Sequence, residues 1–458
     1  MVKPYDVSHE KSQHLAGPYE AFVESHRGSK AYIESYRPVL SDNRNIANFS
    51  LPFKDSIHPI VCESAEGPYV WDRDGNKLID FSGGFGPVLF GHNPPFVRDA
   101  LVDMLSHNRW GLGFEHELVG RCSEKVCRML GTERCTWVNT GTEATTLAMR
   151  LCRLKTNRPK IVIFENSYHG HFDGFLGTPT TAPDKCTPAS PGIARSMVSD
   201  LVMLKYDDEE SLAWIRRHAK DVAGVFCEPV QNRDPSVQPR AFLRALRAIC
   251  DEQAITLVFD EVVTGFRVGS GGAQAMLGVS ADLACYGKAI GGGFPVGLVT
   301  GRADWMKGVD GGLWQYGDTS FPKAARTYFA GTFCKHPLAM ACVNAVLDHI
   351  LEHGDKLYDE LNGNAKYLCD SINKFWSDKK IGFSMVHFGS QMRFIIPANI
   401  AMAFFQTLLC NGVYCWEGRT CFITTTHTRE VIDDMLLALK KTTEALIEHH
   451  ATLPYVAS

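Results

Sequence analysis

Hydrophobic and polar positions follow different patterns along the chain. From Ile60 to Phe81, short apolar runs are separated by a Glu-Gly-Pro turn and an Arg-Asp-Gly-Asn turn, which predicts a small antiparallel β-meander. Beyond about residue 110, apolar runs alternate with amphipathic segments such as EATTLAMRLCRLK. The expected strands cover Thr136–Asn139, Lys160–Phe164, Gly224–Cys227, Thr256–Phe259, Leu283–Cys285 and Gly297–Thr300. Strands that alternate with helices favour a mostly parallel sheet covered on both faces.

The two ends of the chain predict a second domain of α+β type. From Pro337 onward, helical patterns such as LAMACVNAVLDHILEHG surround short strand candidates at FSMVHFG, QMRFIIP and CFITT. Residues 1–45 are polar and contain one amphipathic portion, EAFVESHRGSKAYIESYRPVL. We expect an N-terminal arm and small-domain part at 1–110, a large domain at 111–336 and a C-terminal small-domain part at 337–458.

Composition and charge exclude several classes of function. The chain has 47 Lys and Arg against 51 Asp and Glu, a net charge of −4, so it lacks the basic surface that nucleic-acid binding needs. No apolar run is long enough to span a bilayer, and the polar start MVKPYDVSHEKSQH lacks the apolar core of a secretory leader. The 15 cysteines show no Cys-x-x-Cys spacing, which suits reduced thiols. We expect a cytoplasmic protein without a metal site.

Ligands of an open parallel sheet bind at the carboxyl ends of its strands, so the segments after each apolar run are the candidate site. After the first run, Gly141 and Thr142 open an amphipathic helix. Free N–H groups and the positive end of the helix dipole make such a turn an anion site. An ordinary helix N-cap explains the same turn.

An aromatic residue and two histidines follow the second run. Tyr168, His169 and His171 stand close together there. The histidines are possible metal ligands, although no acidic or thiol partner is near them in the sequence. A structural loop in which Tyr168 forms one wall of a pocket is the alternative.

A carboxylate and a lysine end two further runs. Asp260 ends an apolar strand, where a charge needs a cationic or protonated partner. Lys288 lies between an apolar strand and three glycines, where poor solvation lowers a lysine pKa and makes the residue a candidate Schiff-base nucleophile. Taken alone, the segment fits a surface lysine better. Together, the four segments require a ligand with a phosphate, a protonatable ring nitrogen and an aldehyde, a set that pyridoxal 5′-phosphate (PLP) has.

The motifs NTGTEA, SYHGH, CEPVQ, FDEVVTGFR, YGKAIGGGFPVG and FAGTFCKHPLAM occur in this order between Ile60 and Met340. This stretch resembles class III aminotransferases of PLP fold type I. Its resemblance extends to glutamate-1-semialdehyde 2,1-aminomutases and, more closely, to aminotransferase domains of hybrid polyketide and nonribosomal-peptide synthases. The resemblance implies an α/β large domain with a mostly parallel seven-stranded sheet and a smaller α+β domain built from both termini.

The resemblance also implies a role for individual residues. Lys288 would be the Schiff-base lysine and Asp260 the partner of the pyridinium nitrogen. The ring would lie between Tyr168 and Val262, with Glu228 near it and the phosphate on Gly141 and Thr142. Gly331 and Thr332 would reach the phosphate from the neighbouring subunit, which implies a homodimer with shared active sites.

Two sequence features bear on the branch of the family. Aminomutases usually carry a Pro-Val-Arg-Ala-Phe run before their first strand, where this chain has Leu51–Asp55 without an arginine. In contrast, the stretches Tyr36–Arg44, Glu228–Leu243 and Trp416–Thr428 look like the synthase-associated domains.

We therefore expect an aminotransferase of secondary metabolism. It would move an amino group from an amino-acid donor to the oxo group of a polyketide or fatty-acyl acceptor, either a β-oxo thioester or an aldehyde, with an acyl-carrier protein as a candidate partner. Arg419 is the candidate for holding the donor carboxylate, because a guanidinium binds it bidentately; a salt bridge at a domain interface is its alternative role. The alternative functions are a glutamate-1-semialdehyde aminomutase and a non-catalytic docking or regulatory subunit.

Overall fold

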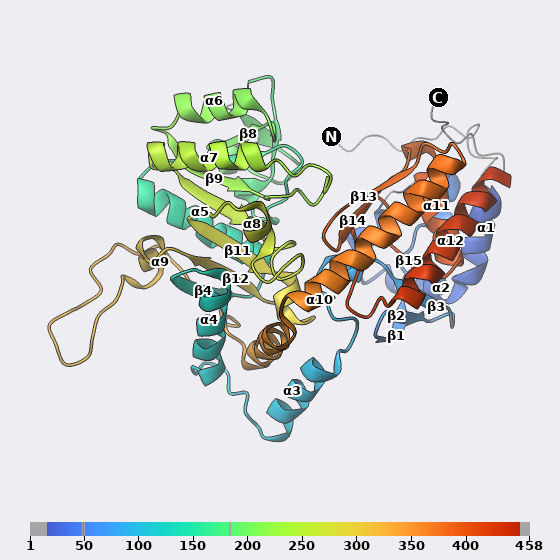
Figure 1. The fold of residues 1–458 in the computed structure, drawn as a ribbon, viewed down its shortest axis with the longest axis horizontal. Helices are drawn as coiled ribbons and strands as arrows, with labels where there is room; N and C mark the ends of the chain where they lie inside the picture. Colours follow the sequence, from blue (N-terminus) through green and yellow to red (C-terminus); the bar gives the residue numbers. More distant parts are fainter. Residues whose placement is uncertain (1–15, 48, 50, 183–184, 449–458) are drawn as a thin grey trace. The chain divides into compact units, whose positions relative to one another are not determined.

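The computed structural model describes residues 16–448 of the chain except 48, 50, 183 and 184 (Figure 1). The polar start on which the expectation of a missing leader rests lies outside these residues. Two compact units are present. The large unit is Pro95–Tyr358, and the small unit is built from the described parts of Met1–Pro94 and Asp359–Ser458.

A seven-stranded sheet with the order β4-β12-β11-β10-β9-β5-β8 forms the centre of the large unit. Its strands are β4 (Arg134–Val138), β5 (Lys160–Phe164), β8 (Leu201–Leu204), β9 (Val222–Cys227), β10 (Thr256–Asp260), β11 (Leu283–Gly287) and β12 (Gly297–Gly301). Only β12 is antiparallel to its neighbours. The predicted mostly parallel sheet is confirmed, and β8 is a strand that the sequence pattern did not predict.

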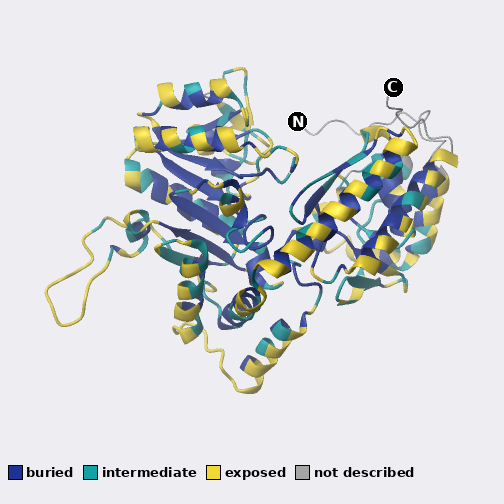
Figure 2. Cartoon of the chain, in the orientation of Figure 1, coloured by how far each residue is buried: buried dark blue, intermediate teal, exposed yellow. Residues whose placement is uncertain are grey.

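Helices cover this sheet on both faces. Every residue of β9, β10, β11 and β12 is buried, which requires cover on both sides because successive side chains of a strand point in opposite directions. Helix α5 (Gly141–Thr156) packs along β9, β11 and β12, and α7 (Arg240–Gln253) packs on β10 and beside α6 (Glu209–Arg217). Figure 2 shows the strands buried and the outer sides of α6 and α7 exposed.

The other elements of the large unit surround this core. They are α3 (Pro95–Ser106), α4 (Glu117–Leu130), the short strands β6 (Gly177–Pro179) and β7 (Cys186–Pro188), α8 (Gly272–Leu277), α9 (Ala303–Asp310) and the 3-10 turns η6 (Asp173–Phe175), η7 (Arg195–Val198) and η8 (Lys288–Gly291).

The small unit contains two small sheets. The expected meander is present as β1 (Cys62–Glu66), β2 (Tyr69–Asp72) and β3 (Lys77–Asp80), and β15 (Val413–Tyr414) joins β3 in parallel. The second sheet consists of β13 (Ser384–Phe388), β14 (Gln391–Ile395) and β16 (Cys421–Phe422). The helical elements are α1 (Ala16–Ser25), α2 (Arg27–Tyr36), η3 (Asn43–Ile46), η4 (Leu51–Ser56), η5 (Gly83–Phe85), α11 (Ala398–Cys410) and α12 (Arg429–Glu448).

Helix α10 (Pro337–Asp378) passes from one unit to the other, and its helical geometry is interrupted at Gly354. The borders between the two units lie at residues 94/95 and 358/359. The sequence predicts these borders at 110/111 and 336/337. The packing around Gly292 in the large unit explains the difference. A Cβ atom at Gly292 would meet Val346 of α10 at 3.0 Å and Val97 of α3 at 3.1 Å. Both helices pack there through side chains that the sequence pattern cannot pair.

The sequence also leads us to expect no membrane span and reduced cysteines. None of the helices in the described part of the chain combines the length and the apolar character that a membrane span requires. All of the cysteines are free thiols.

Candidate functional site

The first part of the site is the N-terminus of α5. Thr140 caps this helix by accepting a hydrogen bond from the Glu143 N–H at 3.1 Å, and the Glu143 carboxylate accepts one from the Asn139 N–H at 2.7 Å. The N–H groups of Gly141 and Thr142 have no acceptor among the described residues. A Cβ atom at Gly141 would lie 2.8 Å from Val262 Cγ1, so only glycine allows this approach. The turn thus offers two free donors beside Val262, which suits an anion.

The loop after β5 closes over this helix end. Gly170 has a φ of +91°, and a Cβ atom there would come within 2.5 Å of Thr142 Oγ1. The same hydroxyl lies 3.2 Å from Nδ1 of His171. In this loop the Tyr168 side chain is 54% exposed, so one face of its ring is open to a ligand.

The partner that Asp260 needs is His169. Its Nδ1 lies 2.8 Å from Oδ2 of Asp260, and both side chains are buried. The other oxygen of Asp260 accepts a hydrogen bond from the Val262 N–H at 3.1 Å. In this arrangement His169 orients the carboxylate of Asp260, and His171 contacts the turn at the start of α5.

Glu228 connects the loop to the end of β9. Its carboxylate accepts hydrogen bonds from the N–H groups of Tyr168 at 2.8 Å and Asn232 at 2.9 Å. Burial raises the pKa of Glu228, and the negative charge of Asp260 acts in the same direction, while His169 opposes it. Glu228 therefore positions Tyr168 and adds negative charge next to Asp260.

Lys288 begins η8 directly after β11. Its φ of +48° is unusual for a residue with a side chain, and such backbone strain is often found at functional sites. Burial lowers the pKa of Lys288; the charges of Asp260 and Glu228 raise it, and the buried cation Arg267 lowers it further. The lysine thus has neighbours that a candidate nucleophile requires.

The sheet order explains how these residues meet. His169 follows β5, Glu228 follows β9, Asp260 ends β10 and Lys288 follows β11, and these four strands are direct neighbours in the sheet. The carboxyl ends of neighbouring parallel strands form one edge, where open α/β sheets bind ligands. This edge offers the groups that PLP requires: free N–H donors, tight glycine contacts, an open tyrosine ring, a fixed carboxylate and an amine.

A pocket of about 420 Å³ adjoins this site. Tyr168 and His169 line it together with residues of β6 and the exposed side chain of Arg233. Lys288, Asp260 and Val262 do not belong to its lining.

Three expected site residues lie apart from this group. Gly331 and Thr332 are exposed, and within this chain their loop contacts the α5 turn through a hydrogen bond from Asn139 Nδ2 to Cys334 Sγ at 3.6 Å. Arg419 belongs to the small unit; its guanidinium is exposed and forms no ion pair with the described residues.

Two residues of this site have no recognisable role in the sequence pattern. His169 reads there as a metal ligand or a loop residue, and nothing in the sequence pairs it with Asp260, because their strands are separated by β9 in the sheet. Arg267 is fully buried, and burial lowers its pKa to about 9. A single arginine in FDEVVTGFR carries no signal of its burial, because arginine is usually a surface residue.

Comparisons with known proteins agree with this geometry. A transaminase structure with PLP bound has a TM-score of 0.82 and 26% identity, and the match covers 93% of this chain and 99% of that one. The β-phenylalanine aminotransferase from Variovorax paradoxus has a TM-score of 0.81 and 26% identity, covering 98% and 100%. A protein from Syntrophobacter fumaroxidans named glutamate-1-semialdehyde 2,1-aminomutase is 38% identical over 325 residues, which are 69% of this chain and 71% of the relative. A protein with that name from Rhodopirellula baltica is 32% identical over 408 residues, 85% and 90% of the two chains.

The fold and the site define an enzyme of PLP fold type I. Residues 52–436 match the family described as aminotransferase class-III, so the chain belongs to that family and is a PLP-dependent aminotransferase. Membership of this family supports an enzyme over the non-catalytic alternative. The synthase-associated branch remains a hypothesis.

Proposed function

We propose that this aminotransferase takes an amino group from an amino-acid donor and transfers it to the oxo group of a polyketide or fatty-acyl acceptor. The acceptor is a β-oxo thioester or an aldehyde, and its oxygen is replaced by the amino group while the donor leaves as its keto acid. Secondary metabolism and a cytoplasmic location belong to the same proposal.

Bound PLP supplies the electron sink on which amino-group transfer depends. In this proposal Lys288 holds the cofactor and moves the proton of the donor Cα. Asp260, oriented by His169, faces the ring nitrogen. Gly141 and Thr142 bind the phosphate, Tyr168 and Val262 enclose the ring, and Glu228 holds Tyr168 in place.

The observation that counts against an aminomutase, and so for the acyl acceptor, is the sequence of residues 51–56. Phe53 stacks on Tyr19 with ring centroids 3.7 Å apart, Lys54 is exposed, and Asp55 pairs with Lys30 at 2.9 Å. The segment contains no arginine. The resemblance to aminomutases implies an arginine at this place, which would bind the carboxylate of the semialdehyde. Arg419 is the proposed contact for the donor carboxylate.

The pocket beside Tyr168 is the proposed place for the acyl part of the acceptor. Its volume of about 420 Å³ falls within the range of roughly 300–1,000 Å³ typical of small-molecule sites. Arg233 at this pocket provides a cation for a phosphate, such as that of a carrier-bound phosphopantetheine arm. An acyl-carrier protein is therefore a proposed partner.

A homodimer with shared sites is the proposed active unit. Several large apolar side chains of the large unit are exposed, among them Phe114 at 84%, Leu313 at 84%, Tyr316 at 92% and Tyr328 at 78%. Exposed apolar groups of this kind suit a protein interface, and Tyr328 precedes Gly331 by three residues. In such a dimer, Gly331 and Thr332 of one chain would reach the phosphate of the other.

The second candidate is a glutamate-1-semialdehyde 2,1-aminomutase. The names of the relatives that are 38% and 32% identical favour it. For this activity, a residue outside the segment 51–56 must bind the substrate carboxylate, because the segment has no arginine.

The two candidates can be separated by one assay series. The PLP-loaded enzyme is given an amino donor with a β-oxo acyl thioester on a carrier protein, the same acyl chain on N-acetylcysteamine, the free aldehyde, or glutamate-1-semialdehyde alone, and products are scored by mass spectrometry. We expect amination of the acyl acceptors and slow conversion of the semialdehyde, because an unpaired carboxylate loses a charge-assisted bond of about 1.5–3 kcal/mol. Efficient formation of 5-aminolevulinate without amination of any acyl acceptor contradicts the proposal.

A further inference from the structure

Helix α10 carries two histidines and a glutamate within about one turn, in the large unit (Figure 1). Because residues three or four positions apart lie on the same face of an α-helix, Glu352 and His353 share a face with His349. One ligand atom from each of the three side chains lies within 4.8 Å of those of the other two. Among the described residues this is the only such group of His, Cys, Asp or Glu side chains.

His349 is oriented by an aromatic neighbour. Its ring stacks on that of Phe96 in α3, with centroids 4.2 Å apart and planes inclined by 3°. Burial lowers the pKa of His349, and His353 acts in the same direction, while Glu352 opposes it. A neutral imidazole keeps the lone pair with which it binds a metal ion. His349 is therefore a neutral and preoriented ligand at pH 7.

His353 has a fixed tautomer. Its Nδ1 lies 2.9 Å from the carbonyl oxygen of His349, and a carbonyl can only accept, so this nitrogen carries the proton. The lone pair of a neutral ring then remains on Nε2. Metal-binding histidines commonly donate their other ring N–H to a carbonyl or a carboxylate in this way. The rings of His349 and His353 lie side by side, with centroids 4.1 Å apart.

Glu352 adds an anionic oxygen to the two nitrogens. Its side chain is exposed and forms no ion pair with the lysines and arginines of the described residues. Zinc binds imidazole nitrogen and carboxylate oxygen at about 2.0–2.2 Å, so two ligands of one tetrahedral ion lie roughly 3.4 Å apart. Small rotations of the exposed Glu352 and His353 side chains suffice to reach this spacing from the observed one.

We propose that His349, Glu352 and His353 bind one divalent transition-metal ion of the zinc type, with water completing its coordination. Two imidazoles and one carboxylate favour such an ion over Mg²⁺ and Ca²⁺, which prefer oxygen ligands. The helical geometry of α10 is interrupted directly after this group, at Gly354 with a φ of +55°. The metal therefore stabilises the last turn before the interruption. This proposal replaces the expectation of a chain without a metal site, and it is independent of the proposed acyl acceptor.

Metal binding can be measured on the holoenzyme. PLP-loaded protein is treated with EDTA, dialysed and titrated by calorimetry with Zn²⁺ and, for comparison, with Mg²⁺. We expect saturable binding of Zn²⁺ and none of Mg²⁺. His353→Gln and Glu352→Gln should each weaken Zn²⁺ binding by at least about tenfold, which is the loss that removal of even an outer partner of a ligand causes. Zn²⁺ should also raise the urea midpoint of the parent more than that of either variant.

His218 provides a matched control in another helix. Its ring stacks on Trp214 with centroids 4.1 Å apart, and its Nδ1 lies 2.9 Å from the carbonyl oxygen of Trp214. His218 thus repeats the local geometry of the proposed ligands but belongs to no group of three ligand side chains. His218→Gln should leave both the Zn²⁺ affinity and the shift of the urea midpoint unchanged.

Three results would overturn the inference. One is the absence of saturable Zn²⁺ binding to the parent. Another is undiminished binding to His353→Gln and Glu352→Gln, which means that the ion binds elsewhere, for example at the exposed thiols of Cys62 and Cys410. Equal binding of Mg²⁺ removes the role of the imidazoles. Because both substituted side chains are exposed, the variants should fold, and their urea midpoints in EDTA verify this.

Discussion

The Nδ1 atom of His169 lies 2.8 Å from Oδ2 of Asp260, and both residues are buried at the carboxyl edge of the central sheet. The imidazole ring packs against both Phe175 and Phe226, with centroid distances of 5.6 and 5.9 Å, and these two rings also contact each other at 5.0 Å. Because Val262 N–H binds the second oxygen, the carboxylate of Asp260 is fixed in one orientation. His169 is therefore a positioning residue for the acid proposed to face the cofactor ring.

Replacing His169 by Phe should lower kcat by about 10- to 100-fold, because a charge-assisted hydrogen bond worth roughly 1.5–3 kcal/mol is lost and Asp260 can turn away. The donor KM should change little. The absorbance spectrum of the bound cofactor should also shift, which a purely structural role would not cause. His218→Phe, a change outside the site, serves as the control. A variant with normal kcat and spectrum contradicts this role for His169.

Lys288 should be the residue that carries PLP. Borohydride treatment of the holoenzyme should bleach its near-visible band and attach the cofactor covalently, and peptide mapping should place the label on Lys288. Lys288→Ala should fold and bind PLP noncovalently, with activity reduced by at least about 10²- to 10⁴-fold because proton transfer is lost. A label on another lysine refutes the assignment.

The lowered pKa of Lys288 also predicts a pH dependence of stability in the apoenzyme. Since its folded-state pKa lies below the unfolded value of 10.5, protonation weakens the fold. This penalty is complete below the folded-state pKa and disappears as the pH rises toward 10.5. Apo Lys288→Met should therefore resist urea better than the apo parent at neutral pH, and the difference should shrink as the pH increases. A difference that is the same at all pH values speaks against a shifted lysine.

Glu261 should stabilise the fold without entering the chemistry. Its buried carboxylate accepts hydrogen bonds from Thr264 Oγ1 at 2.5 Å, Ala273 N–H at 2.9 Å and Gln274 N–H at 2.7 Å. An amide in its place presents N–H groups to these donors, so Glu261→Gln should lower the free energy of unfolding by about 1–3 kcal/mol. The exposed change Glu63→Gln should have almost no effect in the same urea titration. Equal stability of the two variants contradicts the argument.

Shared active sites predict complementation between two inactive chains. Lys288→Ala lacks the lysine, and Thr332→Val lacks the hydroxyl proposed to reach the partner's phosphate. A heterodimer of the two carries one site with both lesions and one with neither, so activity should return toward half of the normal value per dimer. Each variant reassembled alone is the control. Mixtures that exchange chains and stay inactive place the Thr332 loop in its own subunit.

Local patterns were sufficient to predict most of the large unit. Lys160–Phe164 was predicted with its observed bounds, and the runs around Thr256 and Leu283 needed extension by only one and two residues. Short apolar runs between amphipathic helices are local properties, so they can be recognised without tertiary contacts. The four-residue strand β8 and the two-residue strand β15 were missed because strands this short carry little periodicity.

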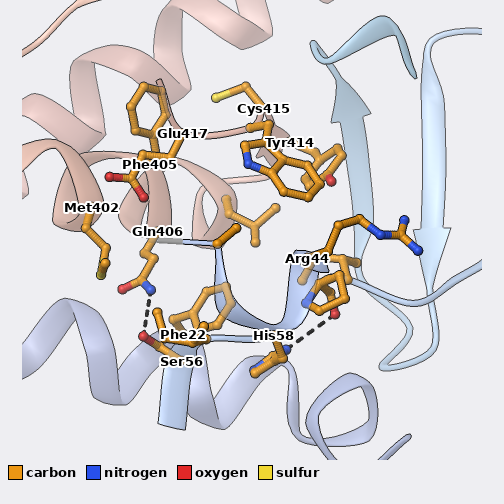
Figure 3. A pocket seen from close by; sticks show the side chains of 16 residues that line it. Phe22, Arg44, Ser56, His58, Met402, Phe405, Gln406, Tyr414, Cys415 and Glu417 are labelled. Carbon is orange, nitrogen blue, oxygen red and sulfur yellow. Dashed lines mark hydrogen bonds between the residues drawn. The ribbon is translucent and has the colours of Figure 1, made fainter. Parts of the chain in front are cut away.

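The sequence alone determined the chemical types at the site. Lys288 and Asp260 each end an apolar run, and in an open parallel sheet such positions share one edge. The tertiary structure decided which side chains meet there. The pairing of His169 with Asp260 and the burial of Arg267 follow from the order of strands in space, not in sequence. The same holds for the hydrogen bond from Gln406 Nε2 to Ser56 Oγ (Figure 3), because residues 350 positions apart become neighbours only when the chain folds.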